Sequence, residues 1–330
     1  SNVEKLTLTS ASTITLSDEF LTANPGVALT LAAGTIKAGA GTTADPIITL
    51  PVSYTGGSGN IKITTGTADD VFNTSSAAVF DSNDTIDGGA GSDTIQVFNE
   101  ATFGTSDVTG DAVSLSLDIY HTNIETILVV DASADNTAGD VTITIADGYT
   151  DAALTIDGSA LDLNAVDLTA GEALTVTSSD TNVALTITGG ASHDTLTTNS
   201  GADSITSGGG NDTIESGGGK DTIYGGTGVD SIRAGEGVDF IDAGAGNDII
   251  EVEDTSDFKT SGGVETVKGG DGTDTLKFTE DAVLTITAPE VEHLYSIEKI
   301  QLGNGGNAAS ITFGNATFTN LGSTSITVVG

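Results

Sequence analysis

Residues 189–251 read GGASHDTLT TNSGADSIT SGGGNDTIE SGGGKDTIY GGTGVDSIR AGEGVDFID AGAGNDIIE, which is a unit of nine residues repeated seven times. Every unit carries Leu or Ile at its eighth position. An acidic linker without structure has no reason to keep an apolar residue in phase, so we expect these units to be folded. The sixth position is always aspartate: Asp194, Asp203, Asp212, Asp221, Asp230, Asp239 and Asp248.

The spacing predicts a coiled chain with two units in each coil. The first six residues of a unit are rich in glycine, which tolerates a positive φ, and they suit a turn. The next three suit a short strand whose apolar eighth residue points inward. Two units then make one coil of 18 residues, and coils stack at about 4.8 Å. The glycines that we assign to these turns are Gly208, Gly210, Gly217, Gly219, Gly226, Gly228, Gly235, Gly237, Gly244 and Gly246.

In such a stack, equivalent turns lie two units apart. Asp194, Asp212, Asp230 and Asp248 then line one edge, and Asp203, Asp221 and Asp239 line the other. Stacked carboxylates repel one another unless a cation lies between them. Ca²⁺ accepts 6–8 oxygens from carboxylates and carbonyls, whereas Mg²⁺ demands a tighter octahedron and retains its waters. We therefore predict several calcium ions between the stacked turns.

Shorter copies of the unit occur elsewhere in the chain. TGTADDVFN at 65–73 places Asp70 at the sixth position, and GGDGTDTLK at 269–277 places Asp274 there. Two further units at 79–96 add Asp84 and Asp93. We include these four aspartates among the candidate calcium ligands. A second pattern is predicted to form strands that cap a roll, and it occurs as VEKL at 3–6, IETI at 124–127, VETV at 264–267 and IEKI at 297–300.

Charge excludes several classes of partner. The chain has 330 residues, 47 of them acidic and nine basic, with a formal net charge of −38. Residues 69–188 contain 21 acidic residues and no basic one, while residues 300–330 contain no charged side chain. No basic surface exists to meet phosphates, which argues against binding to nucleic acid or anionic membranes. There is no cysteine to form a disulfide, so an extracellular fold needs another cross-link, such as a divalent cation.

The fold class that we predict is all-β. It is a parallel β-roll or β-solenoid with calcium-binding nonapeptide repeats, flanked by further β-solenoid or β-sandwich segments. Strands such as VTITI at 141–145 alternate apolar residues with threonine, as a half-buried strand requires. We divide the chain into an N-terminal β segment (1–64), a short repeat block (65–99), a threonine-rich β segment (100–188), the main roll (189–251) and a C-terminal β segment (252–330).

The repeats resemble the hemolysin-type (RTX) calcium-binding repeats. Together with the threonine-rich strands and the IETI-type closures, they make the chain similar to RTX-type surface-layer proteins of Gram-negative bacteria. This resemblance implies export by type I secretion through an uncleaved C-terminal signal, and folding outside the cell when calcium is met. It also implies an extracellular, cell-surface location.

We weighed three classes of function. The first is a structural protein that assembles with further copies of itself into a surface layer or filament, on cell-surface polysaccharide. The second is an adhesin or binding module in which the roll is a spacer stiffened by calcium. The third is the accessory domain of a secreted enzyme. His121, His193 and His293 are isolated and form no H-E-x-x-H motif, and there is no cysteine nucleophile. We therefore expect no enzymatic activity in this chain.

Overall fold

The computed structural model describes residues 5–8, 12–16, 28–31, 34–38, 47–49, 61–64, 69, 71–74, 85–98, 113–117, 121–130, 141–145, 153–157, 174–178, 183–252, 266–279, 283–286, 293–302, 310–313 and 327–329. The chain divides into two compact units: Ser1–Ala165 with Thr175–Val183, and Val166–Leu174 with Ala184–Gly330. All regular elements in the described residues are strands. Every strand pairing that we describe is parallel, so the predicted all-β solenoid is confirmed.

The strands of the first unit belong to several parallel sheets. One sheet has the order β11-β8-β6-β4-β2, and β12-β9-β7-β5 are neighbours in a second. β14 pairs with β12, β10 with β13, and β1 with β3. The strands are β1 (Lys5–Leu8), β2 (Ser12–Leu16), β3 (Ala28–Leu31), β4 (Gly34–Ala38), β5 (Ile47–Thr49), β6 (Ile61–Thr64), β7 (Val71–Thr74), β8 (Thr85–Asp87), β9 (Thr94–Phe98), β10 (Val113–Leu117), β11 (His121–Thr122), β12 (Thr126–Val130), β13 (Val141–Ile145) and β14 (Ala153–Asp157), while β15 (Leu174–Ser178) crosses the division between the units.

The second unit has the same plan. Its sheets have the orders β30-β27-β25-β22-β19-β16, β17-β20-β23-β26-β28-β31-β33, β18-β21-β24 and β29-β32. The strands are β16 (Ala184–Thr188), β17 (Thr195–Thr197), β18 (Ser200–Gly201), β19 (Ser204–Gly209), β20 (Thr213–Glu215), β21 (Gly218–Gly219), β22 (Thr222–Thr227), β23 (Ser231–Arg233), β24 (Glu236–Gly237), β25 (Phe240–Gly246), β26 (Ile249–Val252), β27 (Thr266–Gly272), β28 (Thr275–Phe278), β29 (Val283–Ile286), β30 (Leu294–Tyr295), β31 (Lys299–Gln301), β32 (Ser310–Phe313) and β33 (Thr327–Val329).

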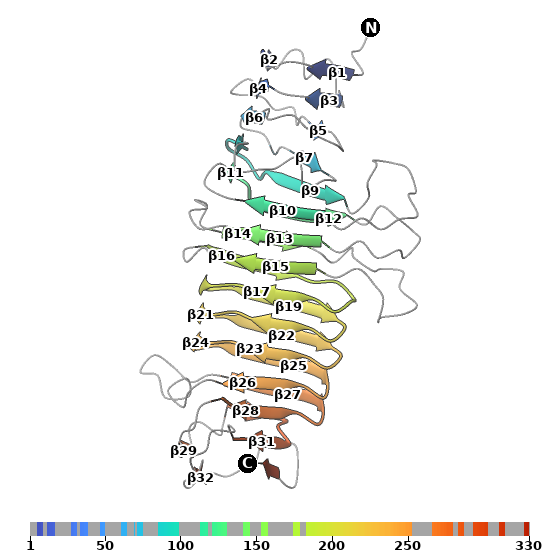
Figure 1. Ribbon diagram of the computed structural model, residues 1–330. Coiled ribbons are helices and arrows are strands. Elements are labelled where there is room, and N and C mark those ends of the chain that lie inside the picture. Colours follow the sequence, from blue (N-terminus) through green and yellow to red (C-terminus); the bar gives the residue numbers. More distant parts are fainter. Residues whose placement is uncertain are drawn as a thin grey trace. The chain divides into compact units, whose positions relative to one another are not determined.

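The register of the main roll has the predicted period of 18 residues. Ile205 lies opposite Ile223 in one sheet, and Ile214 lies opposite Ile232 in the other. Figure 1 shows the strands of this unit as stacked rows. The eighth residues of the seven repeats, from Leu196 to Ile250, are all fully buried. They form the core between the two sheets, because burial of apolar side chains is the main driving force of folding.

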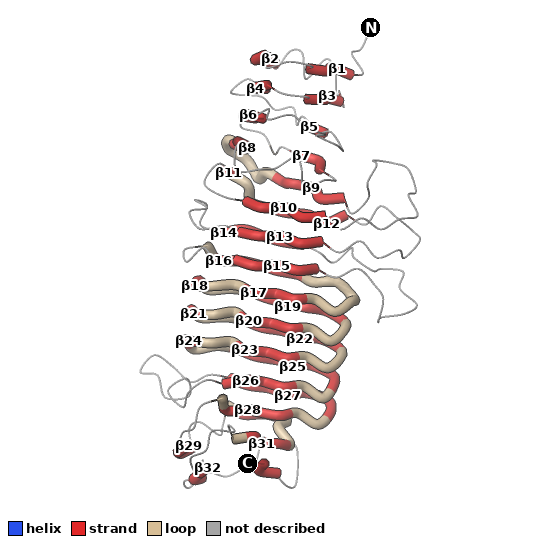
Figure 2. Tube along the Cα trace, in the orientation of Figure 1, coloured by secondary structure: helices blue, strands red, loops and turns tan. Residues whose placement is uncertain are grey.

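The turns are more regular than we predicted. In addition to the three-residue strands, the glycine-rich segments of neighbouring coils pair with one another. Gly208 lies opposite Gly226 and Gly226 opposite Gly244 at one edge, while Gly219 lies opposite Gly237 at the other. Figure 2 shows these turns following the strands in successive coils of the second unit. Because the turns keep the same register as the strands, equivalent residues of successive turns lie one above the other.

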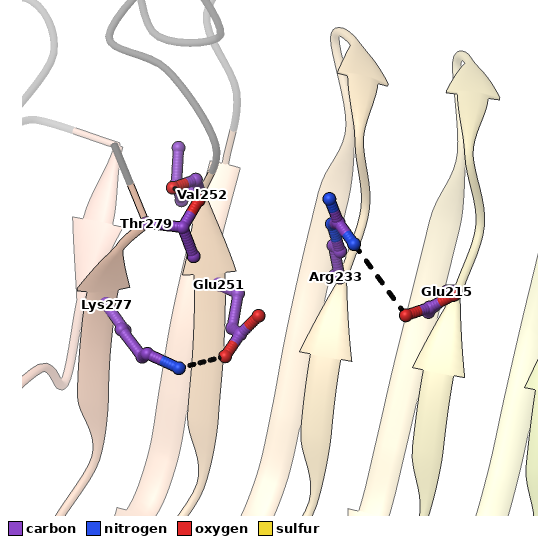
Figure 3. Close-up of polar contacts among 6 residues, drawn as sticks. All are labelled: Glu215, Arg233, Glu251, Val252, Lys277 and Thr279. Atoms are coloured by element: carbon purple, nitrogen blue, oxygen red, sulfur yellow. Dashed lines mark hydrogen bonds and ion pairs between the residues drawn. The ribbon is translucent and has the colours of Figure 1, made fainter. Parts of the chain in front are cut away.

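The coil that follows the last repeat of the main roll is longer than the coils within the roll. Ile250 pairs with Leu276 and Ile241 with Val267, so both steps span 26 residues. An ion pair crosses this step on each sheet: Lys277 contacts Glu251, and Lys268 Nζ lies 3.3 Å from Asp242 Oδ2. Figure 3 shows the Lys277–Glu251 pair. The stack therefore keeps its register across a coil of different length.

Figure 3 also shows Arg233 directed at Glu215 on the neighbouring strand, with 3.8 Å between Nη1 and Oε1.

The regular elements in the described part of the chain are all strands, so that part contains no helix that could span a membrane. The five segments proposed from the sequence remain a prediction.

Candidate metal centre

The glycines at the second and fourth positions shape the turns. All ten that we assigned from the sequence have φ between 86° and 156°, a region that favours glycine. At Gly208 (φ 106°) a Cβ would also lie 2.2 Å from the carbonyl oxygen of Gly190 in the preceding coil. A side chain there is excluded both by the backbone conformation and by the close approach of the next coil.

The aspartates of the first edge form a continuous ladder of hydrogen bonds. In each step the backbone N–H of one residue donates to the Oδ1 atom of the aspartate in the following coil. The donor–acceptor distances are 2.8 to 2.9 Å. The steps run from Leu174 to Asp194, Asp194 to Asp212, Asp212 to Asp230, Asp230 to Asp248, and Asp248 to Asp274.

The second edge carries an equivalent ladder. The Leu185 N–H donates to Asp203 Oδ1, the Asp203 N–H to Asp221 Oδ1, and the Asp221 N–H to Asp239 Oδ1. This ladder includes the one repeat that lacks glycine at its second position, where Asn199 stands instead. The Asn199 carbonyl still accepts the N–H of Gly218 at 2.7 Å. The substitution therefore leaves the stacking of the turns intact.

The ladder carboxylates are buried and only partly bonded. All seven aspartates of the main roll, and Asp274, are at most 3 % exposed. The Oδ2 atoms of Asp230, Asp248 and Asp274 have no hydrogen-bond partner. An uncompensated buried carboxylate is costly, because it has lost its hydration without gaining an opposite charge. These oxygens are therefore available as ligands for a cation.

Burial shifts the acidity of these groups. It raises the pKa of Asp194 from 3.8 to about 7, although N–H donation from Leu174 and Gly190 lowers it. Burial also raises the pKa values of Asp212 and Asp221 to about 6. Asp230 and Asp274 are likewise raised to about 6, mainly by burial. At neutral pH each ladder thus needs a positive charge, either as protons or as a metal ion.

The donor set fits calcium. In the residues described, no three or more acidic or histidine side chains gather at one point. A cation between two coils would thus combine one or two carboxylates with backbone carbonyls and water, which is the oxygen-rich mixture that Ca²⁺ takes. The point where a Cβ would stand on Gly225 lies 2.7 Å from Asp230 Oδ2 and 2.4 Å from the Ala243 carbonyl oxygen. Carboxylate and carbonyl oxygens from neighbouring coils therefore converge.

The shorter repeat blocks have the same local structure. Asp274 extends the first ladder, and Asp93 in the first unit is fully buried. Asp70 and Asp84 lie outside the described residues. Sequence reasoning missed four glycines with the same positive φ, which the second and fourth positions of their units would have identified: Gly89, Gly91, Gly270 and Gly272.

Comparison with protein families agrees with this geometry. The model of the RTX calcium-binding nonapeptide repeat matches residues 80–96, 186–214 and 215–250, in four copies. The chain carries RTX repeats. RTX repeats bind calcium in general, and proteins that contain them are typically secreted. Searches of curated proteins and of solved structures found no match. Asp274 lies outside the matched segments, so its place in the ladder rests on the unit at 269–277 and on its hydrogen bond with Asp248.

Proposed function

We propose that this RTX protein is a secreted, calcium-binding structural protein that self-assembles on the bacterial cell surface, as a surface layer or an extracellular filament. Calcium drives both folding and assembly, and the chain catalyses no reaction. The observation that carries the proposal is the pair of buried aspartate ladders. Oxygens such as Asp248 Oδ2 lack a hydrogen-bond partner, so at neutral pH the roll needs cations between its coils in order to be stable.

The chain ends are the proposed surfaces of self-association. Residues 300–330 carry no charge, while residues 69–299 carry a net charge of −37 that keeps the acidic bodies apart. β33 pairs with β31 and ends the order of its sheet among the described strands. A strand edge without lysine or proline invites pairing with a strand of another chain. Calcium screens the acidic surfaces and so favours this contact.

The test compares the full chain with two variants, by negative-stain imaging and light scattering with and without calcium. Deletion of residues 303–330 should give a protein that folds in calcium but stays monomeric. Thr327→Lys places one charge on β33 and should weaken assembly without changing the far-UV circular dichroism. Sheets or fibres formed by the deletion variant, as by the full chain, would show that the interface lies elsewhere.

A binding module is the second candidate, and one observation favours it. Tyr224 is 43 % exposed on the face of β22, and its ring centroid lies 5.7 Å from that of Phe240. Lys268 Nζ lies 4.6 Å from the Phe240 centroid. Exposed aromatic rings next to charged groups suit the apolar face and the hydroxyls of a sugar. On this alternative, the protein stays monodisperse in calcium and binds cell-surface polysaccharide, and Tyr224→Ala abolishes that binding.

A further inference from the structure

Two short turns in the chain replace the glycine-rich turn of the repeat. In the first unit, Asp87 of β8 pairs with Thr122 of β11, and Thr94 of β9 pairs with Thr126 of β12. Six residues, 88–93, therefore lie opposite only three, 123–125. The first of the three, Asn123, has φ 55°, a left-handed conformation that asparagine tolerates better than most residues.

The second unit repeats this arrangement. Lys268 of β27 pairs with Tyr295 of β30, and Thr275 of β28 pairs with Lys299 of β31. The six residues 269–274 thus lie opposite the three residues 296–298. Ser296 has φ 50°, and the following Ile297 is fully buried, as Ile124 is in the first unit. The same short turn therefore closes a glycine-rich turn in both units.

The third residue of each short turn is a glutamate that takes the place of the ladder aspartate. The Asp274 N–H donates to Glu298 Oε2 at 2.9 Å, and the Asp93 N–H donates to Glu125 Oε2 at 2.6 Å. Both bonds match the aspartate-to-aspartate bonds of the repeats in direction, and the bond to Glu298 also matches them in length. Glutamate is one methylene longer than aspartate, which suits a turn whose backbone is three residues shorter.

The end of the ladder also offers oxygens to a ligand. Asp274 is fully buried and its Oδ2 atom has no hydrogen-bond partner. The point where a Cβ would stand on Gly269 lies 2.6 Å from this Oδ2 and 2.1 Å from the Ser296 carbonyl oxygen. Gly225, Asp230 and the Ala243 carbonyl have the corresponding arrangement inside the repeats. The short turn thus supplies both a carboxylate and a carbonyl to the last glycine-rich turn.

We propose that the short turns are terminal calcium sites, in which Glu298 and the Ser296 carbonyl hold an ion together with Asp274. Glu125, the Asn123 carbonyl and Asp93 form the corresponding site in the first unit. The ladder of the first edge then ends on a bound ion, so its short turn both closes the stack and neutralises Asp274, the last aspartate of that ladder. The inference rests on the proposed calcium-binding function.

The test counts calcium ions bound by the full chain, using equilibrium dialysis and isothermal titration calorimetry with calcium alone. Glu298→Gln keeps an oxygen that accepts the Asp274 N–H but removes the charge. It should lower the count by about one ion, and the double variant with Glu125→Gln by about two. Glu215→Gln is the matched control, because Glu215 lies on the sheet face beside Arg233, and it should leave the count unchanged.

Each result is decisive. An unchanged count and affinity in Glu298→Gln would overturn the inference, because the glutamate would then act only as a hydrogen-bond acceptor. If Glu298→Gln does not fold in calcium, the count is made on Glu298→Asp instead. A folded variant that binds as many ions as the wild type supports the site, and a folded variant that binds one ion fewer overturns it. A full chain that binds no calcium at all would instead refute the proposed function.

Discussion

Replacing Asp230 by asparagine should have opposite effects with and without calcium. Asn keeps an oxygen that can accept the Asp212 N–H but carries no charge. In the metal-free roll, burial raises the pKa of Asp230 from 3.8 to about 6, so its ionised form at neutral pH opposes folding by about 3 kcal/mol. Asp230→Asn removes this cost and should stabilise the metal-free roll at pH 8. In calcium the same change removes a ligand and should destabilise the roll.

The pH dependence has a definite sign. The folded ladder binds protons more tightly than the unfolded chain, so metal-free stability rises as the pH falls from about 7 towards 4. Burial likewise raises the pKa values of Asp212, Asp221 and Asp274 to about 6, so each of these ionised carboxylates also opposes folding at neutral pH. A few such costs are a large part of the whole stability of a domain, which is about 5–15 kcal/mol. We therefore expect the metal-free roll to be unfolded at pH 8 and to gain β structure as the pH falls.

Far-UV circular dichroism of protein treated with a chelating resin tests both statements. Between pH 8 and pH 5 the wild-type signal should change from disordered to β-rich, and Asp230→Asn should move the midpoint to higher pH. At pH 8 the variant should need more calcium than the wild type to fold. Glu215→Gln changes an exposed carboxylate on the strand β20, beside Arg233, and should change neither curve. The reasoning is refuted if Asp230→Asn destabilises the protein equally with and without calcium.

Three further experiments probe other parts of the roll. Asp221→Ala removes a carboxylate that has an aspartate neighbour on both sides, whereas Asp194 has one on one side only. The first change should therefore raise the calcium concentration at the folding midpoint more than Asp194→Ala, and equal shifts would contradict the stacked sites. Gly208→Ala should lower the free energy of unfolding in calcium by at least about 1–3 kcal/mol, since φ is 106° and the preceding coil is close. Gly209→Ala should lower it less, because Gly209 has no positive φ. Thermal melts of both variants measure this difference, and equal losses would refute it. Lys268→Ala loses an ion pair and a cation–π contact and should lower stability by about 1 kcal/mol in the same assay. An unchanged melting temperature would show that these partly exposed contacts contribute nothing.

The sequence was most informative where a residue recurs in phase. An apolar residue at the eighth position of every nine-residue unit predicted the coil of 18 residues. That period in turn placed Asp194 next to Asp212 and Asp203 next to Asp221 in successive coils. Glycine at fixed positions predicted the positive φ values for the same reason. These features follow from local repetition, and they need no knowledge of distant contacts.

Features that depend on unequal spacing escaped prediction. The IETI and IEKI segments were interpreted as cap strands, but the position of Glu125 and Glu298 in the aspartate register was not recognised. The available signal was that each glutamate immediately precedes its strand, as Asp274 does. The pairing of Lys268 with Asp242 could not be read from the period of 18 either, because 26 residues separate the two; only the unit at 269–277 marks where the register resumes.

That longer coil has a consequence for how such a chain can change over time. Ile241 pairs with Val267 and Ile250 with Leu276 in the same parallel register as residues 18 apart in the main roll. Strand pairing therefore fixes where the strands lie but not the number of residues that join them. The number of residues between two paired strands can then change at little cost to the fold, since loop-closure entropy grows only slowly with length. Lineages of such a chain can accordingly diverge in the spacing between their repeats while the repeats themselves keep their pairing.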